Sequence, residues 1–232
     1  MIGKTEARRR GSTLLAAIAV VGVFGAMAAC SDDDDVLIPA STVTTFADSS
    51  FDFTTLHTFA MADTVAHLEN VGVNPVPVTT AFDQTILSQV RTDLLARGYT
   101  EVDARVTRPD FEVLTGVSAS DNYNAFITAN WFSFWGTSPV WGWLPGGVDP
   151  SWTIIYPWFN PGNVVTFQRS TLIVTIVPTT NVVNPLLAAK ELRAVWAGVA
   201  TSLLSQANIT QTNVQNAINI MFQQSPYLTN TP

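Results

Sequence analysis

Two hydrophobic periods run along the chain, and each predicts its own type of element. In residues 79–99 apolar side chains recur every four positions, which places them on one face of a helix. Thr80 fits an N-cap, and Arg97 followed by Gly98 fits a helix end. The predicted apolar face of this helix consists of Phe82, Ile86, Val90 and Leu94.

A second helix is predicted near the C-terminus, over residues 209–227. Thr212 and Gln215 have the spacing of a capping box, and Pro226 ends the helical pattern. The helical spacing again produces one apolar face. It consists of Val214, Ala217, Ile218, Met221 and Phe222.

Segments rich in β-branched and aromatic residues predict the strands. They cover residues 51–59, 99–102, 110–120, 122–131, 164–178 and 191–204. Alternation places Leu172, Val174 and Ile176 on one face of a strand, opposite Thr171, Ile173 and Thr175. The order of strand, helix, several strands and helix predicts an α+β fold. We expect an antiparallel or mixed β-sheet with two helices packed on one face.

The N-terminal residues have the pattern of a secretory signal peptide. Lys4 and Arg8–Arg10 form a basic start, and residues 11–29 carry no charge and end in small side chains. A membrane-spanning anchor is the alternative, but the run is only about as long as a span requires and is rich in Ala and Gly. Residues 1–29 are therefore expected to be a cleaved signal peptide.

Cys30 is the only cysteine in the chain, so it has no intramolecular disulfide partner. The sequence Met27-Ala28-Ala29-Cys30 resembles the lipobox of bacterial lipoproteins, in which the cysteine receives a diacylglyceryl group. Two or more acyl chains, such as palmitate, anchor a protein stably to a membrane. Because Ser31 rather than an aspartate follows Cys30, the resemblance favours the outer membrane with the protein facing the periplasm.

Residues 30–50 are expected to form a lipidated tether, and residues 51–232 one domain. Asp32–Asp35 carry like charges that keep a spacer solvated and extended. Residues 1–29 hold four of the 11 basic and one of the 18 acidic residues, which leaves the rest of the chain with a net charge of about −10. This charge argues against nucleic acid as a partner.

The residues that carry chemistry do not form a recognisable catalytic motif. His57 and His67 are the only histidines, and neither lies in a known pattern. Asp110 and Glu112 lie two apart on a predicted strand, where two carboxylates on one face can act in acid–base catalysis. We interpret them as charges on an exposed strand edge. The sequence thus predicts no catalytic residue, no metal site, no cofactor and no enzymatic activity.

Residues 131–162 form an aromatic-rich insert with six of the seven tryptophans of the chain. Three interpretations are open. The aromatic side chains close a loop over the core, they form an exposed patch for a protein or lipid partner, or they stack on sugar rings of a glycan such as peptidoglycan. The candidate binding surface consists of Trp131, Trp135, Trp141, Trp143, Trp152 and Trp158.

The arrangement of these segments resembles the DUF4136 family of bacterial lipoproteins of unknown function. The resemblance spans about residues 50–228 and is carried by "HTFA", "ILSQVRTDLLARGYTEV", "RPDFEVLTGV", "STLIVTIV", "AVWAGVA" and the closing "QQSPY". It implies the fold and lipoprotein status, and it implies no catalytic residues. Ser170 replaces the glycine that family members tend to have before Thr171-Leu172.

Together these patterns predict a lipid-anchored cell-envelope protein of unknown molecular activity. We expect a non-catalytic binding or accessory module whose partners are the membrane, through its N-terminal lipid, and an envelope protein or a glycan. The alternative is a glycan-binding or hydrolytic module that uses the Trp-rich insert.

Overall fold

The computed structural model describes residues 43–68, 79–118, 141, 143, 152–158, 171–180, 182–183, 190–205 and 209–230. The predicted signal peptide, Cys30, Trp131, Trp135 and the strand predicted at residues 122–131 lie outside these ranges. The backbone of Trp152 is described, but its side chain is not.

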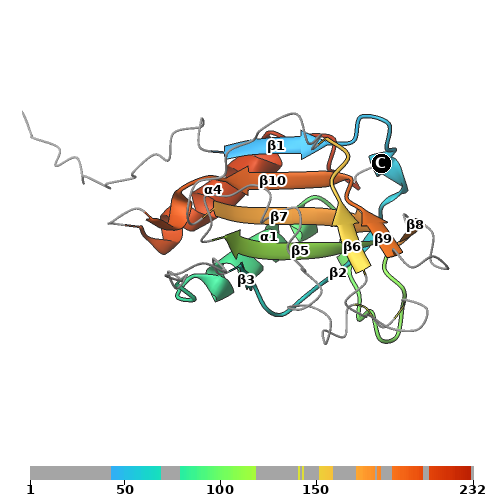
Figure 1. Ribbon diagram of the computed structural model, residues 1–232, viewed down its shortest axis with the longest axis horizontal. Coiled ribbons are helices and arrows are strands. Elements are labelled where there is room, and N and C mark those ends of the chain that lie inside the picture. The colour runs from blue at the N-terminus through green and yellow to red at the C-terminus, as the bar shows by residue number, and fades with distance from the viewer. Residues whose placement is uncertain are drawn as a thin grey trace, which may run out of the picture. The chain divides into compact units, whose positions relative to one another are not determined.

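A seven-stranded mixed sheet forms the centre of the fold (Figure 1). Strands β1, β10, β7 and β5 pair antiparallel in that order, and β5 then pairs parallel with β2 and with β3, while β2 pairs parallel with β4. The strands are β1 (Val43–Ala47), β2 (Thr58–Met61), β3 (Ala66–Leu68), β4 (Thr100–Glu101), β5 (Phe111–Ser118), β7 (Thr171–Pro178) and β10 (Trp196–Ala200).

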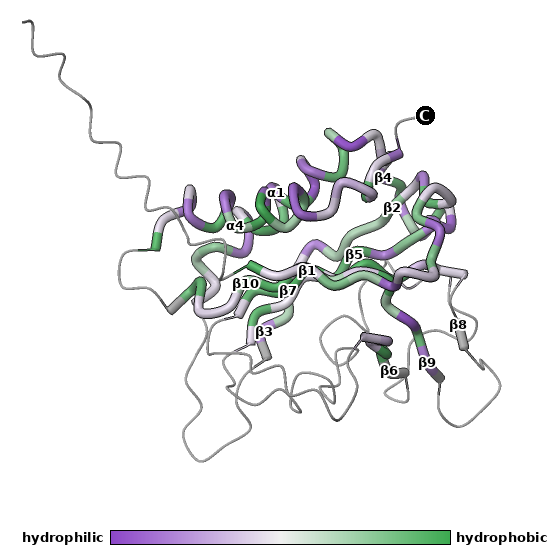
Figure 2. Tube along the Cα trace, turned by 90° about the horizontal axis from the view of Figure 1, so that it is seen from above, coloured by the Kyte–Doolittle hydropathy of each residue, from purple (hydrophilic) through white to green (hydrophobic). Residues whose placement is uncertain are grey.

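The two helices, α1 (Asp83–Ala96) and α4 (Gln211–Gln223), lie side by side on one face of this sheet (Figure 2). The predicted apolar faces are confirmed, because Ile86, Val90 and Leu94 of α1 are buried together with all five predicted residues of α4. Phe82, at the start of α1, is partly buried against the same core. The α+β prediction is therefore confirmed. Within the described ranges, neither helix is long and apolar enough to cross a membrane.

Arg97 connects the C-terminal ends of the two helices. Its guanidinium donates hydrogen bonds to the carbonyl oxygens of Leu228, at 2.9 Å, and of Phe222. The same group lies over the ring of Phe222 at 5.4 Å from its centroid. The Phe222 carbonyl also accepts the backbone N–H of Ser225, so Arg97 adds a charged donor at the C-terminal end of α4, where the helix dipole favours positive charge.

A smaller three-stranded sheet lies on the opposite side of the large sheet (Figure 2). Its strands are β6 (Trp152–Ile155), β9 (Lys190–Arg193) and β8 (Val182–Val183). Strand β9 pairs parallel with β6 and antiparallel with β8. The large sheet is thus covered by helices on one face, and by the small sheet with its neighbouring aromatic residues on the other.

The single strand predicted at residues 191–204 is wrong, because the chain divides it between the two sheets. The backbone N–H of Ala194 donates to Ile155 in the small sheet, whereas that of Val195 donates to Ile176 in the large sheet. Strand β9 therefore ends before Ala194, and β10 begins at Trp196. A short 3₁₀ helix, η4 (Leu203–Ser205), occupies the end of the predicted strand.

The strand predicted at residues 51–59 is also wrong in its first half. The Asp52 carboxylate accepts hydrogen bonds from the backbone N–H and the hydroxyl of Thr54, which winds the chain into the 3₁₀ helix η2 (Phe53–Thr55). Only β2, from Thr58, is extended. Strand β1 moreover lies within the predicted tether of residues 30–50, so the folded part includes Val43 rather than starting near Phe51.

The N-cap of each helix lies two residues away from the predicted one. Helix α1 has Phe82 rather than Thr80 as N-cap, without a side-chain hydrogen bond to the cap. Helix α4 has a capping box, but Thr210 and Asn213 form it instead of Thr212 and Gln215. A capping box usually has glutamate or glutamine at its fourth position. Asn213 can replace them there, because its side-chain oxygen also reaches the N–H of the N-cap residue.

Candidate functional site

The face of the large sheet opposite the helices has its own hydrophobic core. Residues of β5, β7 and β10 meet aromatic side chains of the insert there, and Trp141 is only 2% exposed. Trp143 and Trp158 pack against this core and are partly buried. The first interpretation of the insert therefore applies to Trp141, while Trp143 and Trp158 retain partly exposed surfaces.

The aromatic residues on this face contact one another. The ring of Trp158 is stacked on Phe46 of β1, with centroids 6.3 Å apart, and meets Tyr156 edge-on at 6.0 Å. Trp141 and Trp143 are tilted against each other at 6.5 Å. Such geometries add to the burial of apolar area, and they fix the described part of the insert onto the sheet.

Glu112 is a fully buried carboxyl group within this face. It lies on β5 beside Val177 of β7 and Ala60 of β2. Its interpretation as an exposed strand-edge charge is wrong, because β5 is an interior strand of the sheet. The indole N–H of Trp143 donates a hydrogen bond of 2.8 Å to Oε1 of Glu112. Within the described part of the chain, Oε2 has no hydrogen-bond partner.

Burial raises the pKa of Glu112 well above its usual value, and the hydrogen bond from Trp143 lowers it only in part. A carboxylate transferred out of water without a positive partner is strongly disfavoured, so burial favours the neutral acid. Glu112 therefore has the character of a buried acid that holds its proton above the usual range of carboxyl groups.

Arg108 contacts the ring of Trp143. Its Cζ lies 4.9 Å from the ring centroid, which is a cation–π contact. The guanidinium also donates to the backbone carbonyl and the hydroxyl of Thr179 at the end of β7. Trp143 is thus held between Arg108 and Glu112, and Arg108 is fixed to the main sheet.

The other candidate acid–base residues hold the fold together. The Asp110 carboxylate accepts the backbone N–H groups of His57 and Thr58 at 2.9 and 2.8 Å. The ring of His57 lies 2.6 Å from the side-chain oxygen of Asn230, and that of His67 lies 2.9 Å from Asp83. Asp110, just before β5, and Glu112, within it, therefore bind different groups and form no shared site in the described structure.

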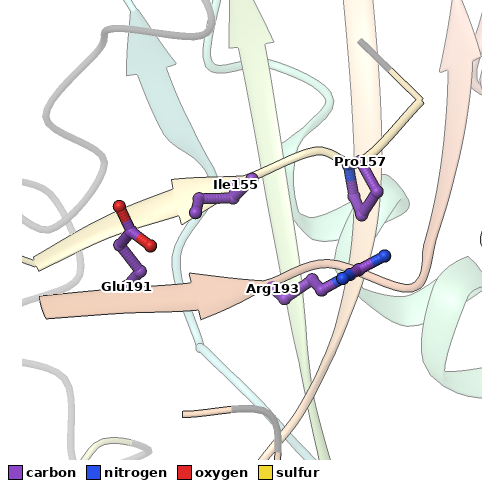
Figure 3. A pocket seen from close by; sticks show the side chains of 4 residues that line it. All are labelled: Ile155, Pro157, Glu191 and Arg193. Atoms are coloured by element: carbon purple, nitrogen blue, oxygen red, sulfur yellow. The ribbon is translucent and has the colours of Figure 1, made fainter. Parts of the chain in front are cut away.

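An open hollow lies on the small sheet. It has a volume of about 410 Å³ and is lined by Ile155, Pro157, Glu191 and Arg193 (Figure 3). The Arg193 guanidinium forms an ion pair of 2.9 Å with Asp48, directly after β1. This hollow was not predicted, since its residues come from strands whose pairing the sequence pattern does not reveal. Among the described residues, no group of three or more acidic, histidine or cysteine side chains could hold a metal ion.

Replacing Trp143 with Phe should lower the free energy of unfolding by about 1–3 kcal/mol, because a buried carboxyl group loses its hydrogen-bond donor. Phe keeps an aromatic ring beneath Arg108. In a chain that already carries Glu112→Leu, the same substitution should cost less, since no carboxyl group remains to lose a partner. Urea unfolding of the four proteins measures the difference, and equal costs in both backgrounds would contradict the assigned bond.

Comparison with known proteins places this geometry in context. The family model described as "Domain of unknown function (DUF4136)" matches residues 43–227. A crystal structure of a DUF4136 family protein from Bacteroides thetaiotaomicron VPI-5482 is 23% identical with a TM-score of 0.54, over 82% of this chain and 97% of that chain. This likeness shows the fold.

More distant is PelC from Paraburkholderia phytofirmans, whose structure is a dodecamer. It is 11% identical with a TM-score of 0.37, over 79% of this chain and 96% of that chain. At this level the likeness supports no statement about assembly. No match was found among curated proteins.

Proposed function

The chain belongs to the DUF4136 family, whose function is unknown, and from this premise we propose that it is a lipid-anchored cell-envelope protein acting as a non-catalytic binding or accessory module. The observation that carries the proposal is Cys30. It is the single cysteine of the chain, and it follows small residues at the end of an uncharged apolar segment. Acylation removes a free thiol that would be reactive in an oxidising compartment.

The proposed location in the cell follows from the same residues. A diacylglyceryl group with a further acyl chain holds a protein at a membrane without a spanning helix. Ser31 at the position after the lipidated cysteine favours the outer membrane, with the domain in the periplasm. Strand β1 begins at Val43, so fully extended residues 31–42 would let the sheet reach at most about 45 Å from the anchor.

The non-catalytic role is supported by the use of the polar residues. Asp110 fixes the start of β2, and the two histidines bind Asn230 and Asp83. Glu112 is fully buried beneath Trp143, away from any solvent-borne substrate. These side chains make contacts that hold the fold together, so we assign the protein's role to its surfaces.

The anchor is tested by growing cells with an alkyne analogue of palmitate. The full chain should become labelled and fractionate with the outer membrane, and Cys30→Ser should lose both the label and the membrane association. Ser31→Ala, next to the acylated position, is the matched control and should keep the label. Unchanged labelling of Cys30→Ser would contradict the proposal.

A further inference from the structure

Within the described residues, strand β1 is the outermost strand on its side of the large sheet. Its one strand partner in these ranges is β10, so its other edge is unpaired there. The N–H of Asp48 donates to Val195, which continues the antiparallel ladder beyond the strand. Because facing residues alternate in such a ladder, the backbone groups of Val43, Thr45 and Ala47 point away from β10.

One of these outward groups is already covered. The side chain of Gln224, at the end of α4, donates to the carbonyl of Val43 at 3.4 Å. In the described structure, the outward backbone groups of Thr45 and Ala47 have no such partner. The free part of the edge therefore offers two N–H and two C=O groups in the spacing that an added strand requires.

This edge lacks the features that usually prevent strand addition. Natural edge strands carry charges, prolines or bulges, whereas Val43–Ala47 contains no charged residue, proline or glycine. The opposite side of the sheet differs. Strand β4 has only two residues, and Glu101 is bound there by Arg91 at 2.8 Å. Of the two end strands β1 and β4, only β1 thus lacks this protection.

The hollow of the small sheet adjoins the end of this edge. Phe46 of β1 stacks on Trp158, next to Pro157 of the hollow, and Asp48 pairs with Arg193 of the hollow. Figure 3 shows the Arg193 side chain extending towards Pro157, and the Glu191 carboxylate on the other side of Ile155. A strand added along β1 therefore runs towards a hollow of about 410 Å³, which is large enough for a side chain.

The charges around the hollow indicate which kind of side chain it would bind. Arg193 is neutralised by Asp48, whereas Glu191 has no ion-pair partner in the described part of the chain. The hollow thus combines the apolar surfaces of Ile155 and Pro157 with one uncompensated negative charge. Downstream of the predicted signal peptide the chain carries a net charge of about −10, which disfavours pairing of two copies through this acidic region.

We propose that the free edge of β1 binds an extended segment of a partner protein, which adds a strand to the large sheet and places a Lys or Arg side chain in the hollow beside Glu191. Main-chain hydrogen bonds to Thr45 and Ala47 supply affinity, and the hollow supplies specificity, as in other complexes formed by strand addition. This inference deepens the proposed role as a binding module and is independent of the anchor.

The test uses the full chain purified in detergent and a phage-displayed library of random octapeptides. The selected peptides should share a Lys or Arg. Thr45→Pro should weaken the most enriched peptide by about tenfold or more, because proline removes one outward N–H and leaves the ladder to β10 intact. Thr45→Ala is the matched control, since it removes the same side chain but keeps the outward N–H. Ala47→Pro is the second variant if Thr45→Pro does not fold.

Glu191→Gln tests the charge. It should weaken the peptide by about fivefold or more at low salt, and it should have no effect on a peptide whose basic residue is replaced by norleucine. Selection of neutral or acidic peptides, or binding that is indifferent to Thr45→Pro and Ala47→Pro, overturns the proposal. A dimer that Thr45→Pro dissociates also overturns it and assigns the edge to a second copy. Lipid labelling is measured separately, so loss of peptide binding with intact labelling rejects this inference alone.

Discussion

Replacing Glu112 with Gln should make the protein more stable at neutral and alkaline pH and flatten the pH dependence of its stability. Gln has nearly the same shape, keeps an oxygen that accepts the Trp143 indole N–H, and cannot ionise. Burial raises the pKa of Glu112 well above its usual value. The folded state therefore holds a proton that the unfolded chain releases at lower pH.

The sign follows from this proton balance. A group whose pKa is raised by folding contributes its full stability below the unfolded value, and this contribution is lost as the pH rises towards the folded value. In that interval the unfolding free energy of the wild-type chain should fall by up to about 1.4 kcal/mol per pH unit through this one group. The Glu112→Gln chain lacks this loss.

Urea unfolding between about pH 4 and about pH 9 measures the effect as a difference between the two proteins, in which contributions from other groups cancel. Near pH 4 the wild-type chain should be as stable as the variant or slightly more stable, because both side chains are neutral and the amide adds an unpaired donor. Glu191→Gln, at a half-exposed position on β9, is the control for replacing a carboxyl group with an amide. A difference that is constant over the whole range would show that Glu112 ionises normally.

The buried faces of the helices and strands were predictable because they depend only on the spacing of apolar residues within each element. Leu172, Val174 and Ile176 lie on the helix side of β7, and Ile173 lies on the aromatic side, as the alternation predicted. The same holds for the apolar stripe of α4, from Val214 to Phe222. Burial of one side of an element imposes the period directly on the sequence, so a single chain is enough to detect it.

The surroundings of Glu112 were not predictable, because they depend on the order of the strands. A carboxyl group in an eight-residue segment has the same local pattern whether the strand is an edge or an interior strand of the sheet. Strand β5 lies between β7 and β2, and the donor to Glu112 comes from Trp143, 31 positions further along the chain. The only available signal was the isolated carboxylate in an otherwise apolar strand, together with a tryptophan-rich insert that could supply donors.

The division of residues 191–204 had a similar cause. Leu192, Arg193, Ala194 and Val195 continue an alternating pattern without a break, and no proline or glycine marks the change of sheet. The change is made by backbone hydrogen bonds to partners far away in the sequence, Ile155 and Ile176. The hollow beside Arg193 exists because of this change of sheet, so neither the hollow nor the neighbouring β1 edge was accessible to pattern reading.

Trp196 connects the large sheet to α4, and its removal should have the largest effect of any single truncation considered. The side chain is fully buried, its ring stacks on Phe222 at 5.5 Å, and its indole N–H donates to the Ser225 hydroxyl at 2.8 Å. The contact is tight: a Cβ at Gly198 would lie 2.8 Å from the Trp196 ring and 2.7 Å from the sulfur of Met221. Gly198 therefore makes room for the indole between β10 and α4.

Trp196→Ala should lower the free energy of unfolding by about 3–5 kcal/mol, since it leaves a large cavity and removes the buried hydrogen bond to Ser225. Trp196→Phe should cost less, because it keeps the stacking on Phe222 and loses only the outer ring and the hydrogen bond. Leu95→Ala, at a position 48% exposed on α1, should change stability by less than about 0.5 kcal/mol. Urea unfolding distinguishes the three variants. A Trp196→Ala chain as stable as Leu95→Ala would mean that α4 is held to the sheet by other contacts.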